Sequence, residues 1–442
     1  MLDIKLFREQ ADLVRESERK RFRNVENVNT VICLDIEWRE SLQRIQELRQ
    51  KRNSLTKEIS KCYKQLQKLA SEDEKKKLEE KAEQLKLDSK KIGNAITEEE
   101  PKTKELLQQR DEYRYRVGNI LDNKVPIADD ETGNLIIRKY GRKKNFPFDI
   151  RNHVDLMELI GGVNTKKASE IAGNRFYYLQ NELVKLNIAL INFALDHLIS
   201  EGYSPMWTPF FVRHEVIKEA AELADFEEQL YKIQDEDLYL IATSEQTLAA
   251  LHRNEIIDEK LLPIKYAGVS SCFRRETGSH GKDTLGIFRV HQFEKVEQYV
   301  YCKPEDSPQL HEEMIGITEK IFKDLRIPYR IVNIASGELN DNASIKYDLE
   351  AWFPASQAYR ELVSATNCRD YQARKLNARF GTLGDPDTYE VVHTLNATAI
   401  ATERFMCCLV ENHQQEDGSI IIPKALKPYM GGIDLIPARN NA

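Results

Sequence analysis

The densest group of residues able to bind phosphate lies between residues 273 and 297, in the run FRRETGSHGKDTLGIFRVHQFEKVE. The pattern predicts two strands, the second starting at Ile287, joined through a Gly- and Ser-containing turn at 277–286. Because side chains alternate between the two faces of a strand, one surface of this hairpin should carry Arg274, Glu276, Arg289, Phe293 and Glu297. Guanidinium groups suit phosphates, an aromatic ring suits a purine, and carboxylates suit an ammonium group. The stretch predicts a site for a nucleotide and an amino acid. The alternative is a solvent-facing sheet surface with cross-strand Arg–Glu pairs.

The composition points to a cytoplasmic protein of more than one domain. A chain of 442 residues is long for a single core, so we expect two or three domains. No segment has the ~18 consecutive apolar residues of a membrane span, and the charged N-terminal run MLDIKLFREQ lacks the apolar stretch of a signal peptide. The seven cysteines form no C-x-x-C pair, which indicates reduced thiols rather than a disulfide framework. We therefore expect the cytoplasm and no membrane partner.

Charge is distributed unevenly along the chain. The net charge is −7, yet residues 38–117 contain 21 Lys and Arg against 16 Asp and Glu. An acidic body with a basic segment is suited to a polyanion that meets only that segment, although a solvated helical surface would have the same composition.

The same segment has the apolar spacing of a helical hairpin. Two series of apolar residues recur at steps that fit a heptad seam: Leu42, Ile45, Leu48, Leu55, Ile59, Cys62, Leu66 and Leu69, then Leu78, Ala82, Leu85, Ile92, Ile96, Leu106, Tyr113, Val117 and Ile120. Ser71 can cap the second helix, with acidic residues following in its first turn. We expect two antiparallel helices of about 30–40 residues each. Pro101 removes a backbone donor and should kink or interrupt the second helix near Thr97–Glu100.

The remainder of the chain has the pattern of an α+β domain. Residues 119–150 are rich in turn residues and predict a linker with one short strand at Leu135–Arg138. From Arg151 onward an amphipathic helix (Leu179–Ser200) is mixed with strand-like runs at Leu238–Ala242, Ile264–Cys272, Ile287–Cys302 and Tyr329–Ile334. Neither G-x-G-x-x-G nor G-x-x-x-x-G-K-[ST] occurs, which argues against Rossmann and P-loop nucleotide domains and for an antiparallel sheet.

The motifs resemble those of a known family. CFRRETGSHGKDT (272–284) and RVHQFEKVE (289–297) resemble the second signature motif of class II aminoacyl-tRNA synthetases, and specifically of seryl-tRNA synthetases in their common, non-zinc form. GYSPMWTP (202–209) resembles the first motif, in which Pro209 matches a proline at the dimer interface. DLYLIATSEQTL (237–248), residues 359–374 and residues 393–432 resemble later blocks, and MLDIKLFRE with the basic hairpin resembles the tRNA-binding arm. The resemblance covers nearly the whole chain.

The resemblance implies a fold and a reaction. The fold would be an antiparallel sheet flanked by helices, preceded by a coiled-coil arm. The expected domains are a tRNA-binding arm (1–118), a linker (119–150) and a catalytic domain (151–442). The enzyme would activate L-serine with ATP to seryl-adenylate and transfer the serine to serine tRNA, whose long variable arm would bind residues 38–117. It would act as a homodimer. Whether selenocysteine tRNA is also charged stays open.

The resemblance also implies roles for individual residues. The catalytic residues would be Arg274, Arg289 and Arg404. ATP would be bound by Arg274, Arg275, Glu276, Val290, Phe293, Glu361, Leu362, Val363, Ser364 and Arg404, with adenine between Phe293 and Arg404. Serine would be bound by Thr243, Ser244, Glu245, Arg274, Glu297 and Thr398. Glu361 and Ser364 would bind Mg²⁺ together with ATP.

The histidines, three departures from the family pattern and two rival functions bear on this assignment. The nine histidines have no H-x-x-x-H spacing and no Cys/His cluster, so we expect no zinc, and His291 is expected to be a hydrogen-bonding scaffold. Leu285, Glu403 and Pro101 depart from the family pattern, and a carboxylate at Glu403 could pair with Arg404. Two rival functions are a synthetase-like enzyme that loads a carrier protein, which would lack the arm, and an inactive nucleic-acid-binding regulator, which would have lost Glu276, Glu361 or Arg404.

Overall fold

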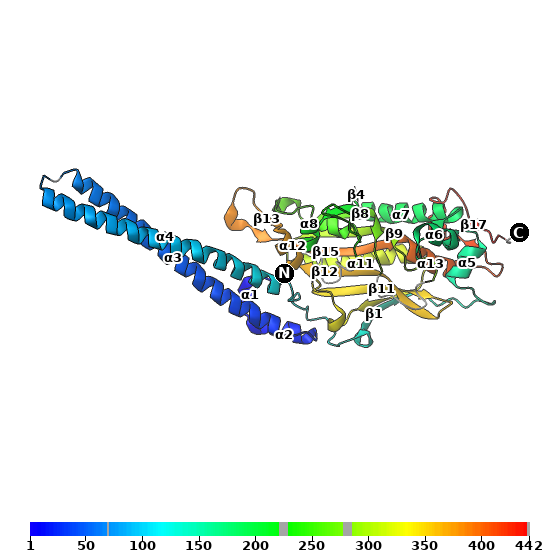
Figure 1. The fold of residues 1–442 in the computed structure, drawn as a ribbon. Helices are drawn as coiled ribbons and strands as arrows, with labels where there is room; N and C mark the ends of the chain where they lie inside the picture. The colour runs from blue at the N-terminus through cyan, green and yellow to red at the C-terminus, as the bar shows by residue number, and fades with distance from the viewer. Residues whose placement is uncertain (69, 221–228, 277–284, 440–442) are drawn as a thin grey trace. The chain divides into compact units, whose positions relative to one another are not determined.

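The chain folds into two compact units (Figure 1). The structure is a computed structural model, and it describes all residues except 69, 221–228, 277–284 and 440–442. The smaller unit comprises Asp3–Arg19 and Asn24–Val117, and the larger unit comprises Met1–Leu2, Lys20–Arg23 and Gly118–Ala442.

The smaller unit is helical. It contains α1 (Ile4–Glu9), α2 (Ala11–Lys20), α3 (Glu26–Leu66) and α4 (Glu72–Arg114). The helices α3 and α4 have 41 and 43 residues, so each is roughly 60 Å long at 1.5 Å per residue. They are longer than the sequence predicts because α3 starts twelve residues before Trp38.

The predicted heptad seam holds α3 and α4 together. All of its described residues are buried or half-buried, and the two helices pack along their length. Ser41 Oγ lies 2.6 Å from Thr103 Oγ1, and Arg44 forms an ion pair of 2.9 Å with Glu99 on the opposite helix. Such pairs between the first half of one helix and the second half of the other require an antiparallel hairpin, as predicted.

Two details of the hairpin differ from expectation. Ser71 is the N-cap residue of α4, but its side chain makes no capping hydrogen bond. The predicted interruption at Pro101 is wrong, because α4 runs continuously from Glu72 to Arg114. One missing N–H donor is a local loss, and the packing of α4 along α3 outweighs it.

An eight-stranded sheet forms the centre of the larger unit (Figure 1). Its strands are ordered β1 (Leu135–Tyr140), β10 (Tyr329–Asn333), β11 (Ile345–Phe353), β12 (Ala358–Arg369), β15 (His393–Ala401), β9 (Gln292–Cys302), β8 (Ile264–Phe273) and β4 (Ser204–Trp207). All neighbours are antiparallel except β4 and β8. The strand β1 comes from segment 119–150, so this segment contributes an edge strand and is more than a connection.

Helices cover one face of the sheet. The helices α7 (Glu182–Ser200), α11 (Ser307–Asp324) and α13 (Thr402–His413) contact β9 or β15, and α7 contacts both other helices. Val296 and Val300 of β9 belong to the apolar core beneath them. Since side chains alternate along a strand, Phe293, Lys295 and Glu297 lie on the opposite face. Within the described part of the chain, only α7 is long and apolar enough to cross a membrane, and Leu186, Leu190 and Phe193 of this helix are buried in the core.

The remaining elements surround this centre. They are α5 (His153–Leu159), β2 (Val163–Asn164), α6 (Thr165–Ala172), β3 (Tyr178–Leu179), β5 (Phe211–Arg213), α8 (His214–Ala220), β6 (Leu238–Leu240), α10 (Glu245–Ala249), β7 (Ile256–Asp258), α12 (Tyr371–Leu376), β13 (Arg379–Gly381), β14 (Glu390–Val391), β16 (Ile420–Ile421) and β17 (Leu435–Ile436).

Candidate active site

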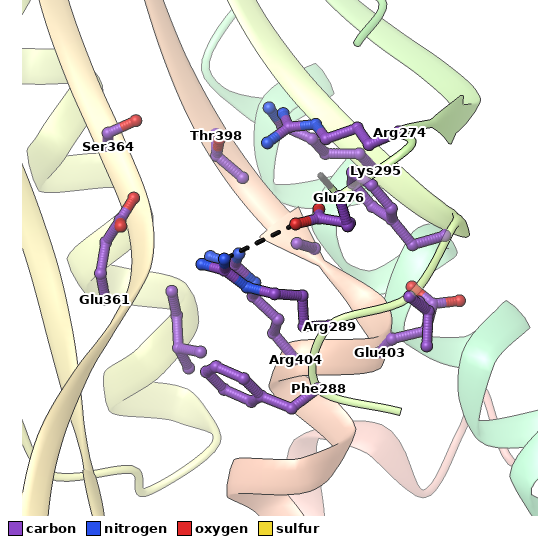
Figure 2. Close-up of a pocket in the computed structure, with 14 residues that line it drawn as sticks. Arg274, Glu276, Phe288, Arg289, Lys295, Glu361, Ser364, Thr398, Glu403 and Arg404 are labelled. Atoms are coloured by element: carbon purple, nitrogen blue, oxygen red, sulfur yellow. Dashed lines mark ion pairs between the residues drawn. The ribbon is translucent and has the colours of Figure 1, made fainter. Parts of the chain in front are cut away.

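Ten of the residues predicted to act in the site line one cavity on the face of the sheet opposite α7, α11 and α13 (Figure 2). They are Arg274, Glu276, Arg289, Val290, Phe293, Glu361, Leu362, Ser364, Thr398 and Arg404. They come from the ends of β8 and β9, from β12 and β15, and from the start of α13. We call this space the phosphate cavity because three guanidinium groups face it.

The strand boundaries around this cavity differ from the prediction. The strands β8 and β9 pair antiparallel as expected, but β9 begins at Gln292 rather than Ile287, so Arg289 precedes the strand. Arg274 and Glu276 follow the end of β8, and Glu276 has a positive φ of 49°. Residues 277–284 of the predicted turn lie outside the described residues. Side-chain alternation therefore predicts which residues lie together, although Arg274, Glu276 and Arg289 lie outside the paired strands.

His291 fixes the two chain segments at this point. Its backbone carbonyl accepts a 2.9 Å hydrogen bond from Arg274 N, and its Nδ1 lies 2.8 Å from Arg274 O. His291 is the hydrogen-bonding scaffold that the sequence predicts. Across the cavity mouth, Arg289 Nη1 lies 3.6 Å from Glu276 Oε2, while Arg289 Nε has no hydrogen-bond partner among the described residues.

Positive charge is concentrated in the phosphate cavity. Burial, together with the positive charges of Arg274 and Arg289, lowers the pKa of Arg404, and Glu361 and Glu276 act against this. Figure 2 shows the guanidinium groups of Arg289 and Arg404 pointing toward the strand that carries Glu361 and Ser364. Three guanidinium groups held near one another suit a polyanion such as a nucleotide phosphate chain.

The aromatic partners of the arginines differ from the family-implied arrangement. Arg274 lies over the Phe293 ring at 5.3 Å, and Arg404 lies over the Phe288 ring at the same distance. Phe288 lines the cavity and is absent from the residues that sequence reasoning selected. The sequence offers little indication of this role, since a Phe beside the apolar Ile287 is typical of a core residue.

A β-bulge brings Glu361 and Ser364 to the same wall. Residues three apart on a regular strand face opposite sides. The register of β12 against β11 shifts by one residue at Leu362, between the pairs Leu349↔Val363 and Glu350↔Glu361. The extra residue turns Glu361 and Ser364 to the same side, and both line the cavity.

The electrostatics keep Glu361 ionised. Burial is the largest influence on its pKa and raises it, but Lys346, Arg404, Arg274 and Lys295 together lower the pKa below the usual value. Opposite Ser364, Asp348 Oδ1 is buried and has no hydrogen-bond partner among the residues that the structure describes. A carboxylate and a hydroxyl on one wall suit Mg²⁺, which prefers oxygen ligands and shares its coordination with phosphates. In the described ranges, no three His, Cys, Asp or Glu side chains form a metal-binding group by themselves.

A second cavity adjoins the first on the same face of the sheet. Its lining includes Thr243, Glu245, Arg274, Lys295 and Ser364, and we call it the hydroxyl cavity. Glu297 is buried and lines neither cavity, but its Oε1 accepts hydrogen bonds from Thr243 Oγ1 of the hydroxyl cavity at 3.1 Å and from Thr398 Oγ1 of the phosphate cavity at 3.2 Å. Glu297 and Thr398 face each other in the pairing of β9 with β15, so strand register sets this contact.

Besides the buried Glu297, three predicted residues line neither cavity. Arg275 lines a different hollow with Tyr231 and Tyr239, Val363 is buried in the core, and Ser244 is buried with its Oγ 3.5 Å from the carbonyl of Gly268. Their side chains therefore do not line the site, although their backbones lie next to residues that do.

Lys295 was not selected from the sequence, and the Glu403 hypothesis was wrong. Lys295 lines both cavities and forms an ion pair with Glu297. Its position two residues before Glu297, on the same strand face, was the available signal. Glu403 accepts hydrogen bonds from Tyr177 Oη at 2.6 Å and from the backbone N–H of Glu294 at 3.0 Å, and its carboxyl group points away from Arg404 (Figure 2).

Comparison with known proteins identifies the family. Residues 1–121 match the family described as "Seryl-tRNA synthetase N-terminal domain", and residues 229–413 match "tRNA synthetase class II core domain (G, H, P, S and T)". A serine--tRNA ligase of Methanosphaera stadtmanae is 56% identical over 99% of this chain and 100% of its own length. The chain belongs to the seryl-tRNA synthetase family.

Further members of the seryl-tRNA synthetase family agree in sequence and in fold. A cytoplasmic serine--tRNA ligase of Arabidopsis thaliana is 45% identical over 99% of this chain and 96% of its own. The crystal structure of the seryl-tRNA synthetase from Pyrococcus horikoshii complexed with ATP superimposes with a TM-score of 0.92 at 44% identity, and each chain covers 100% of the other. The chain is therefore an ATP-binding ligase that activates serine and transfers it to tRNA.

Proposed function

We propose that ATP occupies the phosphate cavity and serine the hydroxyl cavity, so that the two react where the cavities meet. One observation carries this assignment: the two cavities share three lining residues, Arg274, Lys295 and Ser364. At that junction the serine carboxylate would attack the α-phosphorus of ATP, and the bond to pyrophosphate would break. The protein contributes position and charge rather than a covalent nucleophile.

In the phosphate cavity, Arg274, Arg289 and Arg404 bind the phosphates, while Glu276 and the backbone at Val290 contact adenine. Phe293 and Phe288, each beneath an arginine, are the aromatic surfaces available to the base. Glu361 and Ser364 hold Mg²⁺, which would neutralise phosphate charge. This role is supported by the bulge at Leu362 and by the lowered pKa of Glu361.

Where the two cavities adjoin, Glu297 and Thr398 bind the serine hydroxyl, and Thr243 and Glu245 of the hydroxyl cavity bind the ammonium group. The proposal is supported by the burial of Glu297, which is 2% exposed, and by the hydroxyl groups that surround it. Alanine has no hydroxyl group and would forgo the hydrogen bonds that serine can add to these buried polar groups.

Serine-dependent ATP–pyrophosphate exchange tests this proposal, followed by charging of total tRNA. We expect exchange with serine and charging of the serine-accepting fraction alone. Exchange without charging would favour the carrier-loading alternative, and absence of both activities would favour the inactive regulator.

We also propose that residues 38–117 bind the long variable arm of serine tRNA. The proposal is supported by their five excess positive charges and by the match of residues 1–121 to the family's N-terminal domain. Replacing residues 38–117 with a short flexible linker should leave pyrophosphate exchange largely intact and abolish charging at physiological salt, because phosphate contacts provide the affinity. Normal charging by the folded truncated protein would refute this role.

The enzyme would act as a two-fold homodimer through the edge strand β4 and the neighbouring helix α7. This is supported by exposed apolar side chains: Trp207 is 77% exposed and Phe211 50%, while Val184, Ile188 and Ile199 of α7 are also exposed. An isologous contact would bury these groups. Sedimentation at micromolar concentration should give a dimer, and an active monomer would exclude it.

A cytoplasmic location is supported by seven free cysteines.

A further inference from the structure

We propose that Lys295 is a catalytic residue of serine activation, a second cation that contacts the serine carboxylate and the α-phosphate beside Arg274. The inference rests on the proposed occupants of the two cavities. The proposed binding of ATP and of serine gives Lys295 no role, and this inference assigns one.

The position of Lys295 is the first observation. Apart from Arg274 and Ser364, it is the one residue that lines both cavities among those described. The nucleophile and the electrophile must meet at that junction, so a side chain that borders both cavities borders the reacting atoms.

The burial of Lys295 is the second observation. The residue is 9% exposed, and lysine is almost never buried to this degree without a partner. Its Nζ forms an ion pair with Glu297 and lies 3.3 Å from Thr243 Oγ1. An ammonium group has three N–H donors, and these are its two polar partners in the part of the chain described. One donor remains available to an incoming anion.

The surrounding charges are the third observation. Burial, and next the positive charge of Arg274, lower the pKa of Lys295 to about 8. The ammonium group is therefore mainly charged at neutral pH, but it is held close to another cation. An anion between Lys295 and Arg274 would relieve this repulsion, so the fold prepares a place for a carboxylate or a phosphate before either substrate arrives.

The chemistry at the junction needs such a charge. As a serine carboxylate oxygen bonds to the α-phosphorus, the bond from phosphorus to the pyrophosphate oxygen breaks and its electron pair leaves with pyrophosphate. Two anions are brought together and no proton is transferred. A fixed ammonium group beside Arg274 lowers the repulsion between them and stabilises the charge on the α-phosphate oxygens.

The simpler alternative is that Lys295 only holds Glu297 in place. The two roles predict different losses. A residue that acts only through Glu297 would change the preference for serine over alanine and the KM for serine. A residue that contacts the reacting groups would lower kcat and weaken the binding of the adenylate itself.

The test compares Lys295→Met and Lys295→Arg with the wild type in serine-dependent pyrophosphate exchange, and measures binding of a non-hydrolysable seryl-adenylate analogue. Lys265→Met is the matched control, because Lys265 also lies on a strand of the sheet, is partly buried and pairs with a carboxylate, Glu313. We expect Lys295→Met to lower kcat by about 100-fold, as loss of a preorganised charge does, with weaker analogue binding and little change in the KM for ATP. Lys295→Arg should recover part of kcat, and Lys265→Met should keep it.

Two results would overturn the inference. One is a kcat for folded Lys295→Met within threefold of the wild-type value. The other is a normal kcat and normal analogue binding with a changed serine preference, which would make Lys295 a positioning residue. Failure of the proposed function is a separate outcome, since the wild type itself would then show no serine-dependent exchange.

Discussion

The two adjoining cavities solve different recognition problems with different chemical groups. In the phosphate cavity, guanidinium groups stand at the wall, and burial together with the positive charges of Arg274 and Arg289 lowers the pKa of Arg404. Beside the hydroxyl cavity, one buried carboxylate is already held by two threonine hydroxyls and a lysine. Charge acts over several ångströms and tolerates an open wall, whereas discrimination of a hydroxyl group requires buried partners at hydrogen-bond distance. The first cavity should therefore govern rate, and the second should govern the choice of amino acid.

The largest effect should come from removing a guanidinium group from the phosphate cavity. Arg274→Ala and Arg404→Ala should each lower serine-dependent pyrophosphate exchange by about 100-fold or more, because the charge they place against phosphate is lost. The preference for serine over alanine should change little. Arg379→Ala, at an exposed arginine of β13, is the control. Near-normal exchange by a folded Arg274→Ala or Arg404→Ala protein would remove that residue from the site.

The next effect concerns Mg²⁺. Glu361→Gln removes one negative charge from the wall. The Mg²⁺ concentration needed for half-maximal exchange should therefore rise by roughly tenfold, which is the effect expected from losing one charge-assisted contact. Titration of exchange with Mg²⁺ measures this shift. Glu350→Gln is a suitable control, because Glu350 pairs with Glu361 in register but bonds to Arg330. An unchanged Mg²⁺ requirement in Glu361→Gln would exclude Glu361 as a ligand.

A smaller effect is expected at the proposed contact with the serine hydroxyl group. Thr398→Val keeps most of the side-chain shape and removes the hydroxyl group that donates to Glu297. The KM for serine should rise roughly 5- to 10-fold, the usual value of one hydrogen bond of about 1 kcal/mol. The KM for ATP should stay near the wild-type value. If the KM values for serine and ATP rose equally, Thr398 would not be a contact specific to serine.

The smallest effect is on stability and lies beside the phosphate cavity. Burial and the neighbouring Glu294 raise the pKa of Glu403 well above its usual value. Its contribution to stability is fully present below the unfolded-state pKa of about 4.5 and is lost as pH rises through the folded-state pKa. Glu403→Gln keeps a neutral group there, so it should raise the thermal midpoint by roughly a few degrees at pH 8 and leave it nearly unchanged at pH 5. An equal shift at both pH values would show that Glu403 is not held protonated.

Local patterns in the sequence predict the hairpin and most of the site. The heptad seam is set by residues a few positions apart, so α3 and α4 follow from spacing alone, and the residues of the motifs at 272–297, 359–374 and 393–404 do line the phosphate cavity. The start of α3 was less accurate, because the helix begins at Glu26, and α4 continues through Pro101 because its packing on α3 outweighs the lost donor.

The rest could not be predicted, because it depends on pairing between distant segments. The bulge at Leu362 becomes visible only once β12 is aligned with β11. Glu403 turns toward Tyr177, which lies 226 residues earlier in the chain. Phe288 reads as a core residue until Arg404 of α13 lies over its ring. Lys295 reads as one charge among several until both cavities are defined.

In the proposed site, Glu297 and Thr398 select the amino acid by its hydroxyl group. The most direct measurement is pyrophosphate exchange by the wild-type enzyme with serine and with alanine, compared with Glu297→Ala. We expect kcat/KM for serine to exceed that for alanine by at least about 100-fold in the wild type, since alanine cannot make the hydrogen bonds of the serine hydroxyl group. Glu297→Ala should remove most of this preference. Activation of alanine as readily as serine by the wild type would contradict it.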